Sequence, residues 1–155
     1  MNNIAFKKLL KLTVEDIDLQ PKQVGGTLFT YCNIGSAFIL SCFGSDILWR
    51  DNEHAFLANK QIEIIKSSDS FVKVSMNDAS ALAQENKLVF ACQSKKGGHG
   101  HICALYPKPS EMSGHWGGYV PIVANVGKEN FVKKLSYAWK SVFKNDVKFY
   151  LFKGD

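Results

Sequence analysis

Hydrophobic residues recur at helical spacing through the first half of the chain. Between residues 33 and 42, one stripe is formed by Ile34, Ala37, Phe38 and Ser41. A spacing of three to four residues predicts a helix, and Gly44 directly after the run predicts its end. We expect Thr30 or Asn33 to cap the start of this helix, because short polar side chains accept hydrogen bonds from the first free backbone N–H groups.

Three further segments have the pattern of helices. The stripe Ala55, Ala58, Ile62 and Ile65 predicts a helix over residues 53–66, with a candidate cap at Asp51 and Asn52. A short helix is predicted over residues 77–85, capped by Asn77 or Asp78. Residues 128–143 are predicted to be helical from the stripe Phe131, Leu135, Ala138 and Val142.

Short apolar runs elsewhere are typical of strands. They cover residues 71–74, 88–93, 101–106, 119–126 and 147–152. The first two dozen residues look like a partly ordered lead-in, with a turn marked by Pro21 and Gly25-Gly26. Because helices come first and strands mostly follow, we expect an α+β fold in which N-terminal helices pack on an antiparallel sheet.

The length and composition are those of an ordinary globular protein. The 155 residues are enough for one domain, 1–155, whose core we place at about residues 27–152. The net charge of +5 favours an anionic partner such as nucleic acid, a lipid surface or a bacterial cell wall. The longest basic groupings are short pairs, such as Lys7-Lys8 and Lys133-Lys134, and the sequence shows no basic helix interleaved with aromatics. We therefore do not expect a nucleic-acid partner.

The four cysteines carry no metal-binding or disulfide pattern. Cys32, Cys42, Cys92 and Cys103 form no CxxC pair and lie within apolar runs, where a free thiol behaves as a small hydrophobe. We expect no metal, no cofactor and no disulfide scaffold, with folding in a reducing cytoplasm. No export signal or membrane-spanning run stands out, so a role outside the cytoplasm would require delivery by a route other than Sec.

Cys32 and His101 form the most informative pairing in the sequence. Cys32 stands at the start of the helix predicted from residue 33, where free N–H groups and the helix dipole favour a thiolate. His101 opens the apolar strand Ile102-Cys103-Ala104-Leu105 after a glycine-rich turn. A histidine in this position can take the thiol proton and return it to a leaving group. Cys42 is the internal comparison, because it lies late in the same helix, where the dipole gives no help.

A histidine base needs a partner that holds its ring and selects its tautomer. Asn125, on the next predicted strand, can accept from an imidazole N–H group, and Tyr119 and His115 are the alternatives. His99 is the second candidate for the base. His99 and His101 are also an alternative pair of metal ligands, with His115 or a carboxylate as the third, although no recognised zinc spacing is present.

Several polar and aromatic residues are candidates for substrate binding. Tyr31 and Asn33 flank the cysteine, Asn59 lies on the second predicted helix, and His99 precedes the histidine strand. Trp116, in the loop before the next strand, is a candidate aromatic wall together with Tyr106. For each of these residues, a place in the core or on the surface is the competing interpretation.

The segment Gly100-His101-Ile102-Cys103-Ala104-Leu105 resembles the histidine strand of NlpC/P60-type cysteine amidases, a papain-like superfamily. The order of segments over roughly residues 27–152 is similar to that of the small amidase effectors of type VI secretion, including an aromatic C-terminal strand. The resemblance implies a papain-like core, Cys32 as nucleophile and His101 as base. It leaves Asn125 and Tyr119 both open as the third member.

The resemblance also implies a function. Family members cleave an amide bond of the peptidoglycan stem peptide, often between D-glutamate and diaminopimelate. The chain departs from the family pattern beside the nucleophile, where Tyr31 and Asn33-Ile34 replace the usual Asp and Ser-Gly, so roles of those flanking residues do not transfer. We expect a monomer that is made in the cytoplasm, acts on the cell wall after non-Sec delivery without inserting into a membrane, and is inhibited by an immunity protein.

Two other functions fit the same residues. A cysteine-dependent acyltransferase or a protein-directed peptidase would keep the Cys32–His101 pair and change the acyl acceptor or the substrate. A non-catalytic wall-binding module would keep the fold and have an inert Cys32. Thiol reactivity and the products released from cell wall distinguish these hypotheses.

Overall fold

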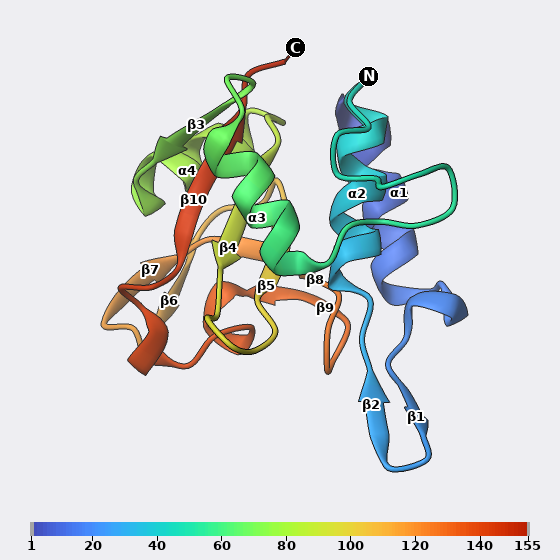
Figure 1. Ribbon diagram of the computed structural model, residues 1–155. Coiled ribbons are helices and arrows are strands. Elements are labelled where there is room, and N and C mark those ends of the chain that lie inside the picture. The colour runs from blue at the N-terminus through green and yellow to red at the C-terminus, as the bar shows by residue number, and fades with distance from the viewer. Residues whose placement is uncertain (1, 155) are drawn as a thin grey trace.

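A six-stranded antiparallel sheet forms the centre of the molecule. The computed structural model describes residues 2–154, and over that range the sheet has the order β3-β10-β4-β5-β8-β9 (Figure 1). Its strands are β3 (Phe71–Val74), β4 (Val89–Gln93), β5 (His101–Leu105), β8 (Ile122–Asn125), β9 (Phe131–Lys134) and β10 (Lys148–Phe152). All neighbouring pairs are antiparallel, which confirms the predicted α+β class with an antiparallel main sheet.

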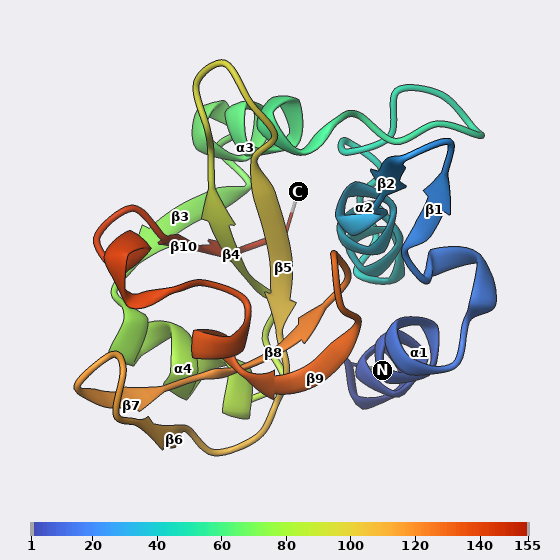
Figure 2. The same ribbon diagram turned by 90° about the horizontal axis from the view of Figure 1, so that it is seen from below.

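Helices cover both faces of this sheet. The described residues contain α1 (Asn2–Val14), α2 (Cys32–Cys42), α3 (Ala58–Ser67) and α4 (Met76–Gln84). Side chains of β5 alternate between two buried clusters, because successive residues of a strand point to opposite faces. Ile102 and Ala104 pack with α1, α2 and α3, whereas Cys103 and Leu105 pack with α4. Figure 2 shows α1 beside α2, with α3 and α4 on opposite sides of β4.

The N-terminal segment is a packed helix, and the prediction of a partly ordered lead-in is wrong. Ala5, Phe6 and Leu9 of α1 are buried, and the Phe6 ring meets Phe43 edge-on with centroids 5.7 Å apart. The lysines in this segment interrupt the apolar run in sequence, but on a helix they lie on the exposed face. The hydrophobic core therefore includes residues from Ala5 onward.

Residues 128–143 are not a helix. They form β9, the 3₁₀ turn Leu135–Tyr137 and a second 3₁₀ turn, Ser141–Phe143. β9 pairs with β8 in a register that runs from Asn125 opposite Phe131 to Ile122 opposite Lys134. The predicted apolar stripe does not face the core as a unit, because Val142 is 76% exposed. Pairing with β8 satisfies the backbone of this segment and overrides its helical spacing.

The helix predicted over residues 53–66 begins five residues late, at Ala58. Asp51 accepts hydrogen bonds from the backbone N–H groups of Glu53 and His54, and Trp49 pairs with Ala55 in an isolated β-bridge. These contacts hold the segment in a turn, because an aspartate that binds nearby N–H groups competes with helix formation.

Other boundaries also differ from the predictions. The segment 119–126 divides at Pro121, which has no backbone N–H, into β7 (Gly118–Val120) and β8. β7 pairs instead with β6 (Glu111–Ser113) in a small separate hairpin. The α4 cap is Ser75, whose side chain accepts from the N–H of Asp78, in place of Asn77 or Asp78.

A second small hairpin leads into α2. β1 (Lys22–Val24) and β2 (Thr27–Phe29) are joined by Gly25 and Gly26, whose φ angles of 55° and 83° suit glycine. The predicted turn at Gly25-Gly26 is therefore confirmed. Figure 1 shows this hairpin projecting from the body of the molecule.

None of the helices described in residues 2–154 has the length and apolar character needed to span a membrane.

Candidate functional site

Cys32 is the first residue of α2, as the sequence predicts. Tyr31 is the N-cap residue, but it makes no side-chain capping bond, and neither does the expected cap Thr30 or Asn33. The helix lies close against the sheet at Gly35, where an added Cβ would come within 3.1 Å of Val126 Cγ2. This close approach brings the N-terminal turn of α2 against β5 and the end of β8.

A buried glutamine ties this turn to α3. Gln61, which has no exposed surface, accepts a 2.8 Å hydrogen bond from Ser36 Oγ and donates a 2.8 Å bond to the Asn33 carbonyl. Its amide nitrogen also donates to the Leu48 carbonyl, at 3.3 Å. A buried amide with satisfied donors and acceptor restricts the elements that it joins. Gln61 therefore fixes the position from which Cys32 projects.

The Cys32 thiol is largely buried and lies against the start of β5. Its side chain belongs to the cluster that contains Ile102, and the residue is 8% exposed. Burial raises the pKa of the Cys32 thiol above its usual value, while the backbone N–H groups of Ile102 and Asn33 oppose that rise by favouring the thiolate. Ile102 directly follows His101, so the sulfur lies close to the backbone that carries the predicted base.

His101 and Asn125 are brought together by two neighbouring strands. His101 opens β5, Asn125 ends β8, and His101 Nε2 lies 2.5 Å from Asn125 Oδ1. The other end of the Asn125 amide donates from Nδ2 to the Glu129 carbonyl, at 2.8 Å. An amide oxygen can only accept a hydrogen bond, so the proton of this pair is on Nε2 and the second ring nitrogen, Nδ1, is free of a proton.

The His101 ring is enclosed on two other sides. Its centroid lies 5.0 Å from the Trp139 ring, and Trp139 Nε1 donates to Gln93 Oε1 at 2.9 Å. Gln93 is the residue opposite His101 in the β4–β5 pair. An added Cβ at Gly127 would come within 3.2 Å of His101 Cε1, so the glycine allows the β8–β9 turn to approach the ring. Burial lowers the pKa of His101, and the bond to Asn125 opposes this effect by favouring the protonated ring.

The three residues of the predicted triad lie on three adjoining elements, and the contacts described for residues 2–154 join His101 with Asn125. Those contacts do not join Cys32 with His101, because Cys32 packs with Ile102 on one face of β5, whereas the His101 ring packs with Trp139 of the cluster on the other face. The thiol on α2, the imidazole on β5 and the amide on β8 have the chemistry of a nucleophile, a base and an orienting group. The neutral imidazole presents an unprotonated Nδ1 at neutral pH, which is the state that can accept a proton from a thiol.

The other candidates for the triad lie elsewhere. Tyr119 is 64% exposed in the β6–β7 hairpin, and the partner of His101 is Asn125. His99 and His115 are exposed loop residues. Over the described part of the chain, no three His, Cys, Asp or Glu side chains are grouped so that they could hold a metal ion, so the alternative metal site is not assembled.

The predicted substrate-binding residues divide into two groups. Tyr31 and Asn33 flank Cys32 and are partly exposed, although the Asn33 side chain donates to the Phe56 carbonyl. His99 is exposed in the loop that precedes His101. Trp116 does not form an exposed aromatic wall, because it is 4% exposed and donates to the Trp139 carbonyl from within the core.

Asn59 has a different place from the one expected. Its side chain donates to the carbonyls of Lys95 and Gly98 and accepts from the Lys95 N–H. All three of these hydrogen bonds are made to the β4–β5 loop, which leads directly into His101. Asn59 therefore holds the loop in position, and these bonds leave its side chain little freedom to contact a substrate.

Two residues of the site, Gln61 and Trp139, were not expected from the sequence. Gln61 is a polar position on the otherwise apolar stripe of its helix, between Ala58 and Ile62, and that interruption was the available signal. Trp139 lies in the segment that was predicted to be helical, and no local signal places it beside His101. The four cysteines are free thiols, and Cys42 is exposed at the end of α2, not buried as its apolar surroundings predict.

The chain matches no protein-family model and no curated protein in the two comparisons. Its function is therefore inferred from its own site.

Proposed function

We propose that the protein is a cysteine amidase or peptidase that hydrolyses an amide bond of peptidoglycan. The observation that carries this proposal is the 2.5 Å contact between His101 Nε2 and Asn125 Oδ1, which leaves Nδ1 as the basic nitrogen of a histidine whose strand packs against the start of α2. A thiol, a base with a selected tautomer and free N–H groups at a helix start are the parts that acyl transfer requires.

The reaction proceeds in two stages. His101 Nδ1 takes the Cys32 proton while the sulfur attacks the scissile carbonyl carbon, and the resulting oxyanion is stabilised by backbone N–H groups at the start of α2. The protonated His101 then gives its proton to the leaving nitrogen as the C–N bond breaks, which leaves an acyl-enzyme. His101 next takes a proton from water as the water attacks the thioester carbonyl. The C–S bond breaks, the thiol is restored and the carboxylic acid is released.

Peptidoglycan is the substrate favoured by the resemblance to NlpC/P60-type amidases and by the net charge of +5. The stem peptide carries carboxylates, so a cationic protein is attracted to it. The proposal includes a papain-like core, the D-glutamyl–diaminopimelate bond as the preferred target, and action as a secreted antibacterial effector or lysin. Non-Sec delivery, action as a monomer and inhibition by an immunity protein belong to the same proposal.

The burial of Cys32 favours one second candidate, a wall-binding module without catalysis. A thiol that is 8% exposed and has a raised pKa is less nucleophilic than an accessible thiolate. For hydrolysis, the side chains that bury Cys32 must move when substrate binds, and the thiol and the His101 ring must come within hydrogen-bond reach of each other. The two candidates differ in whether covalent bonds of the wall are broken.

The direct test is digestion of purified peptidoglycan, with the released fragments identified by mass spectrometry. Wild-type protein and Cys42→Ala should release the same fragments, whereas Cys32→Ala should release none and should keep the wild-type fold. Fragment masses name the cleaved bond. Equal release by Cys32→Ala would refute the thiol mechanism. Transfer of an acyl group to an added amine in place of water would identify an acyltransferase, and cleavage of proteins without cleavage of the wall would identify a protein peptidase.

A further inference from the structure

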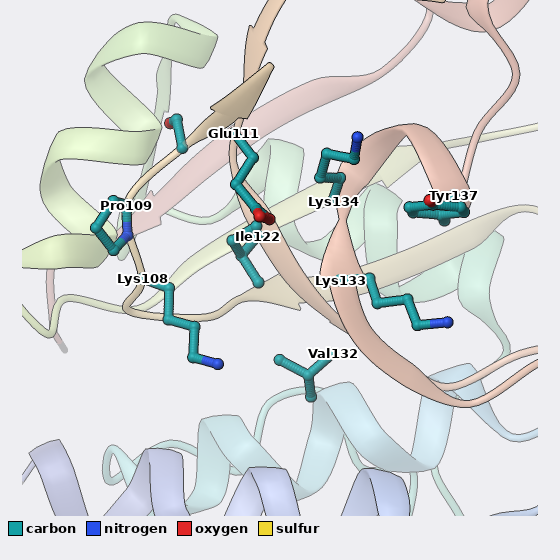
Figure 3. A pocket seen from close by; sticks show the side chains of 9 residues that line it. Lys108, Pro109, Glu111, Ile122, Val132, Lys133, Lys134 and Tyr137 are labelled. Atoms are coloured by element: carbon teal, nitrogen blue, oxygen red, sulfur yellow. The ribbon is translucent and has the colours of Figure 1, made fainter. Parts of the chain in front are cut away.

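An open pocket lies on the sheet away from Cys32. It has a volume of about 720 Å³ and is formed between the loop after β5 and the edge strand β9 (Figure 3). Its walls carry basic, acidic and apolar groups, of which the most important are Lys108, Glu111, Ile122, Lys133, Lys134 and Tyr137. Neither Cys32 nor His101 lines it.

Three lysines and one glutamate give the pocket a net positive charge. Lys108, Lys133 and Lys134 form no ion pair with an Asp or Glu anywhere in residues 2–154, and Glu111 in the same wall is also unpaired there. Lys134 is anchored by a 3.0 Å hydrogen bond to the Met112 carbonyl. The amino groups of Lys133 and Lys134 lie 5.5 Å and 5.6 Å from the Tyr137 ring centroid, so both lysines of β9 are held beside this ring, and neither is paired with a carboxylate in residues 2–154.

The pocket contains more than a cluster of lysines. The Tyr137 side chain is 63% exposed at its edge, and Ile122 provides an apolar wall. Figure 3 shows Glu111 between Lys108 and Lys134, with Tyr137 on the other side of Lys134. A ligand that fills this surface would therefore combine carboxylates for the lysines, an amino group for Glu111 and an apolar or ring-shaped part for Tyr137.

The same pair of strands links this pocket to the candidate catalytic site. In the β8–β9 ladder, Ile122 and Lys134 are at one end, while Asn125 and Phe131 are at the other. Three residues of strand separate the ends, a distance of about 10 Å. An extended polymer that reaches the cysteine site is long enough to contact the pocket as well.

We propose that this pocket is a second binding site for peptidoglycan, which holds a carboxylate- and amine-bearing stem peptide away from the scissile bond. This inference rests on the proposed function for the identity of the polymer. Nucleic acid fits the pocket less well, because its phosphates would meet Glu111 and because its sugar–phosphate backbone carries no cationic amino group to pair with that carboxylate. A stem peptide provides both charges, and its attached sugars provide the ring-shaped surface.

The test measures binding separately from cleavage. Cys32→Ala protein is sedimented with purified insoluble peptidoglycan, and its affinity is compared with that of Cys32→Ala carrying Lys108→Gln and Lys133→Gln. In the described structure these two amino groups lie over the Tyr106 and Tyr137 rings, at an exposed surface, so their removal should change the thermal unfolding midpoint only slightly. The matched control is Lys7→Gln with Lys8→Gln, two exposed lysines on α1 that remove the same charge.

We expect the pocket variant to bind about fivefold more weakly, as the loss of two exposed ion pairs would cause. The control variant should bind like its parent, and in active protein the pocket substitutions should raise KM and leave kcat unchanged. Equal affinity of the pocket variant and the control would overturn the inference. A second outcome would also overturn it: a DNA oligonucleotide that displaces the protein from the wall as effectively as an equal concentration of a soluble disaccharide-tripeptide. The pocket would then select its ligand by charge alone.

The two proposals fail in different ways. If wild-type protein releases no fragments but the lysine substitutions weaken sedimentation, the hydrolase proposal fails and the binding site stands. If wild-type protein releases fragments with a KM that the lysine substitutions do not change, the hydrolase stands and the second site is refuted.

Discussion

Asn125 Oδ1 accepts a 2.5 Å hydrogen bond from His101 Nε2, and this contact sets the protonation of the candidate base. The Asn125 amide cannot turn over, because its Nδ2 donates to the Glu129 carbonyl at 2.8 Å. The oxygen must therefore face the histidine and select the tautomer with the proton on Nε2. A backbone carbonyl four residues beyond Asn125 thus determines which nitrogen of His101 is basic.

Replacement of Asn125 should reduce activity without unfolding the protein. Asn125→Ala removes the acceptor for Nε2–H and frees the imidazole to turn and to change tautomer. We expect kcat to fall by about tenfold or more, which corresponds to the loss of one hydrogen bond in the transition state. Steady-state hydrolysis of a soluble wall fragment measures this. Asn145→Ala, at an exposed position, is the control, and activity of Asn125→Ala equal to that of wild type would exclude the orienting role.

The activity should persist below the usual pKa of histidine. Burial lowers the pKa of His101, so its neutral form is retained at pH values below 6.5. The raised pKa of the Cys32 thiol moves the alkaline limit upward. A profile of kcat/KM from pH 4 to 10 should therefore show a plateau that is wider than the interval between the ordinary pKa values of histidine and cysteine. An acid limb centred above pH 6.5 would contradict this assignment.

The same lowered pKa predicts a dependence of stability on pH. The unfolded chain takes up a proton on His101 at about pH 6.5, while the folded protein does so only at a lower pH. The contribution of His101 to stability is therefore fully present above about pH 6.5 and is lost as pH falls toward the folded-state pKa. Urea unfolding of wild type and His101→Gln between pH 5 and 8 isolates the contribution of His101 titration to the free energy of unfolding. Glutamine can still donate to Asn125 and does not titrate. A difference between the two proteins that stays constant over this range would contradict the prediction.

Trp139 should protect the His101–Asn125 pair from water. Trp139→Ala removes the ring that lies 5.0 Å from the imidazole, and we expect it to cost about 3 kcal/mol of unfolding free energy. The pKa of His101 should rise toward its ordinary value in this variant as solvent enters, which NMR titration can follow. Trp139→Phe keeps an aromatic ring but loses the bond to Gln93 and part of the ring area, so it is the conservative comparison. An unchanged His101 pKa in Trp139→Ala would refute the shielding role.

Gly100 should tolerate no side chain, unlike its neighbour Gly98. An added Cβ at Gly100 would clash with Asn59 Oδ1 and lie 2.9 Å from the Gln93 carbonyl oxygen. Gly100→Ala should therefore displace the loop before His101 and destabilise the fold by about 1–3 kcal/mol. The Gly98→Ala Cβ would meet only the flexible Lys95 side chain, so this variant should be close to wild type. Thermal unfolding compares the two, and equal midpoints would show that the loop adapts without cost.

Thiol labelling should distinguish the four cysteines. Cys42 is exposed and should react first with iodoacetamide, whereas burial raises the thiol pKa of both Cys92 and Cys103 and should protect them. The reactivity of Cys32 is therefore best measured in a Cys42→Ser background. There we expect slow labelling that becomes slower still in His101→Ala, read by peptide mass spectrometry. Labelling of Cys32 at the same rate with and without His101 would show that the two residues do not cooperate.

Local sequence determined the elements in which neighbouring residues all favour the same conformation. The helix that begins at Cys32, the strand that begins at His101 and the glycine turn at residues 25 and 26 are where the spacing places them. Each has a local cause, such as a stripe of apolar residues, an unbroken apolar run or residues suited to positive φ. The antiparallel α+β class followed from the order of these elements.

Tertiary structure decided the elements whose pattern is ambiguous on its own. Residues 131–134 have helical spacing, but they form β9 because β8 offers backbone partners along the whole segment. In residues 2–14, lysines interrupt the apolar pattern of the sequence, but the segment forms a packed helix because α2 covers its apolar side. In both cases the deciding contact comes from a distant segment, which no window along the chain contains.

The candidate site shows the same division. The candidate roles of Cys32, His101 and Asn125 could be predicted from residue type and strand order, because a thiol at a helix start and an imidazole on a strand are both local features of the sequence. The contacts that tune the site come from folding: Glu129 orients Asn125, Trp139 covers His101, and Gln61 holds the turn that carries Cys32. Sequence determined which groups are present, whereas burial and long-range hydrogen bonds, which exist only after the chain has packed, decided how they are held and protonated.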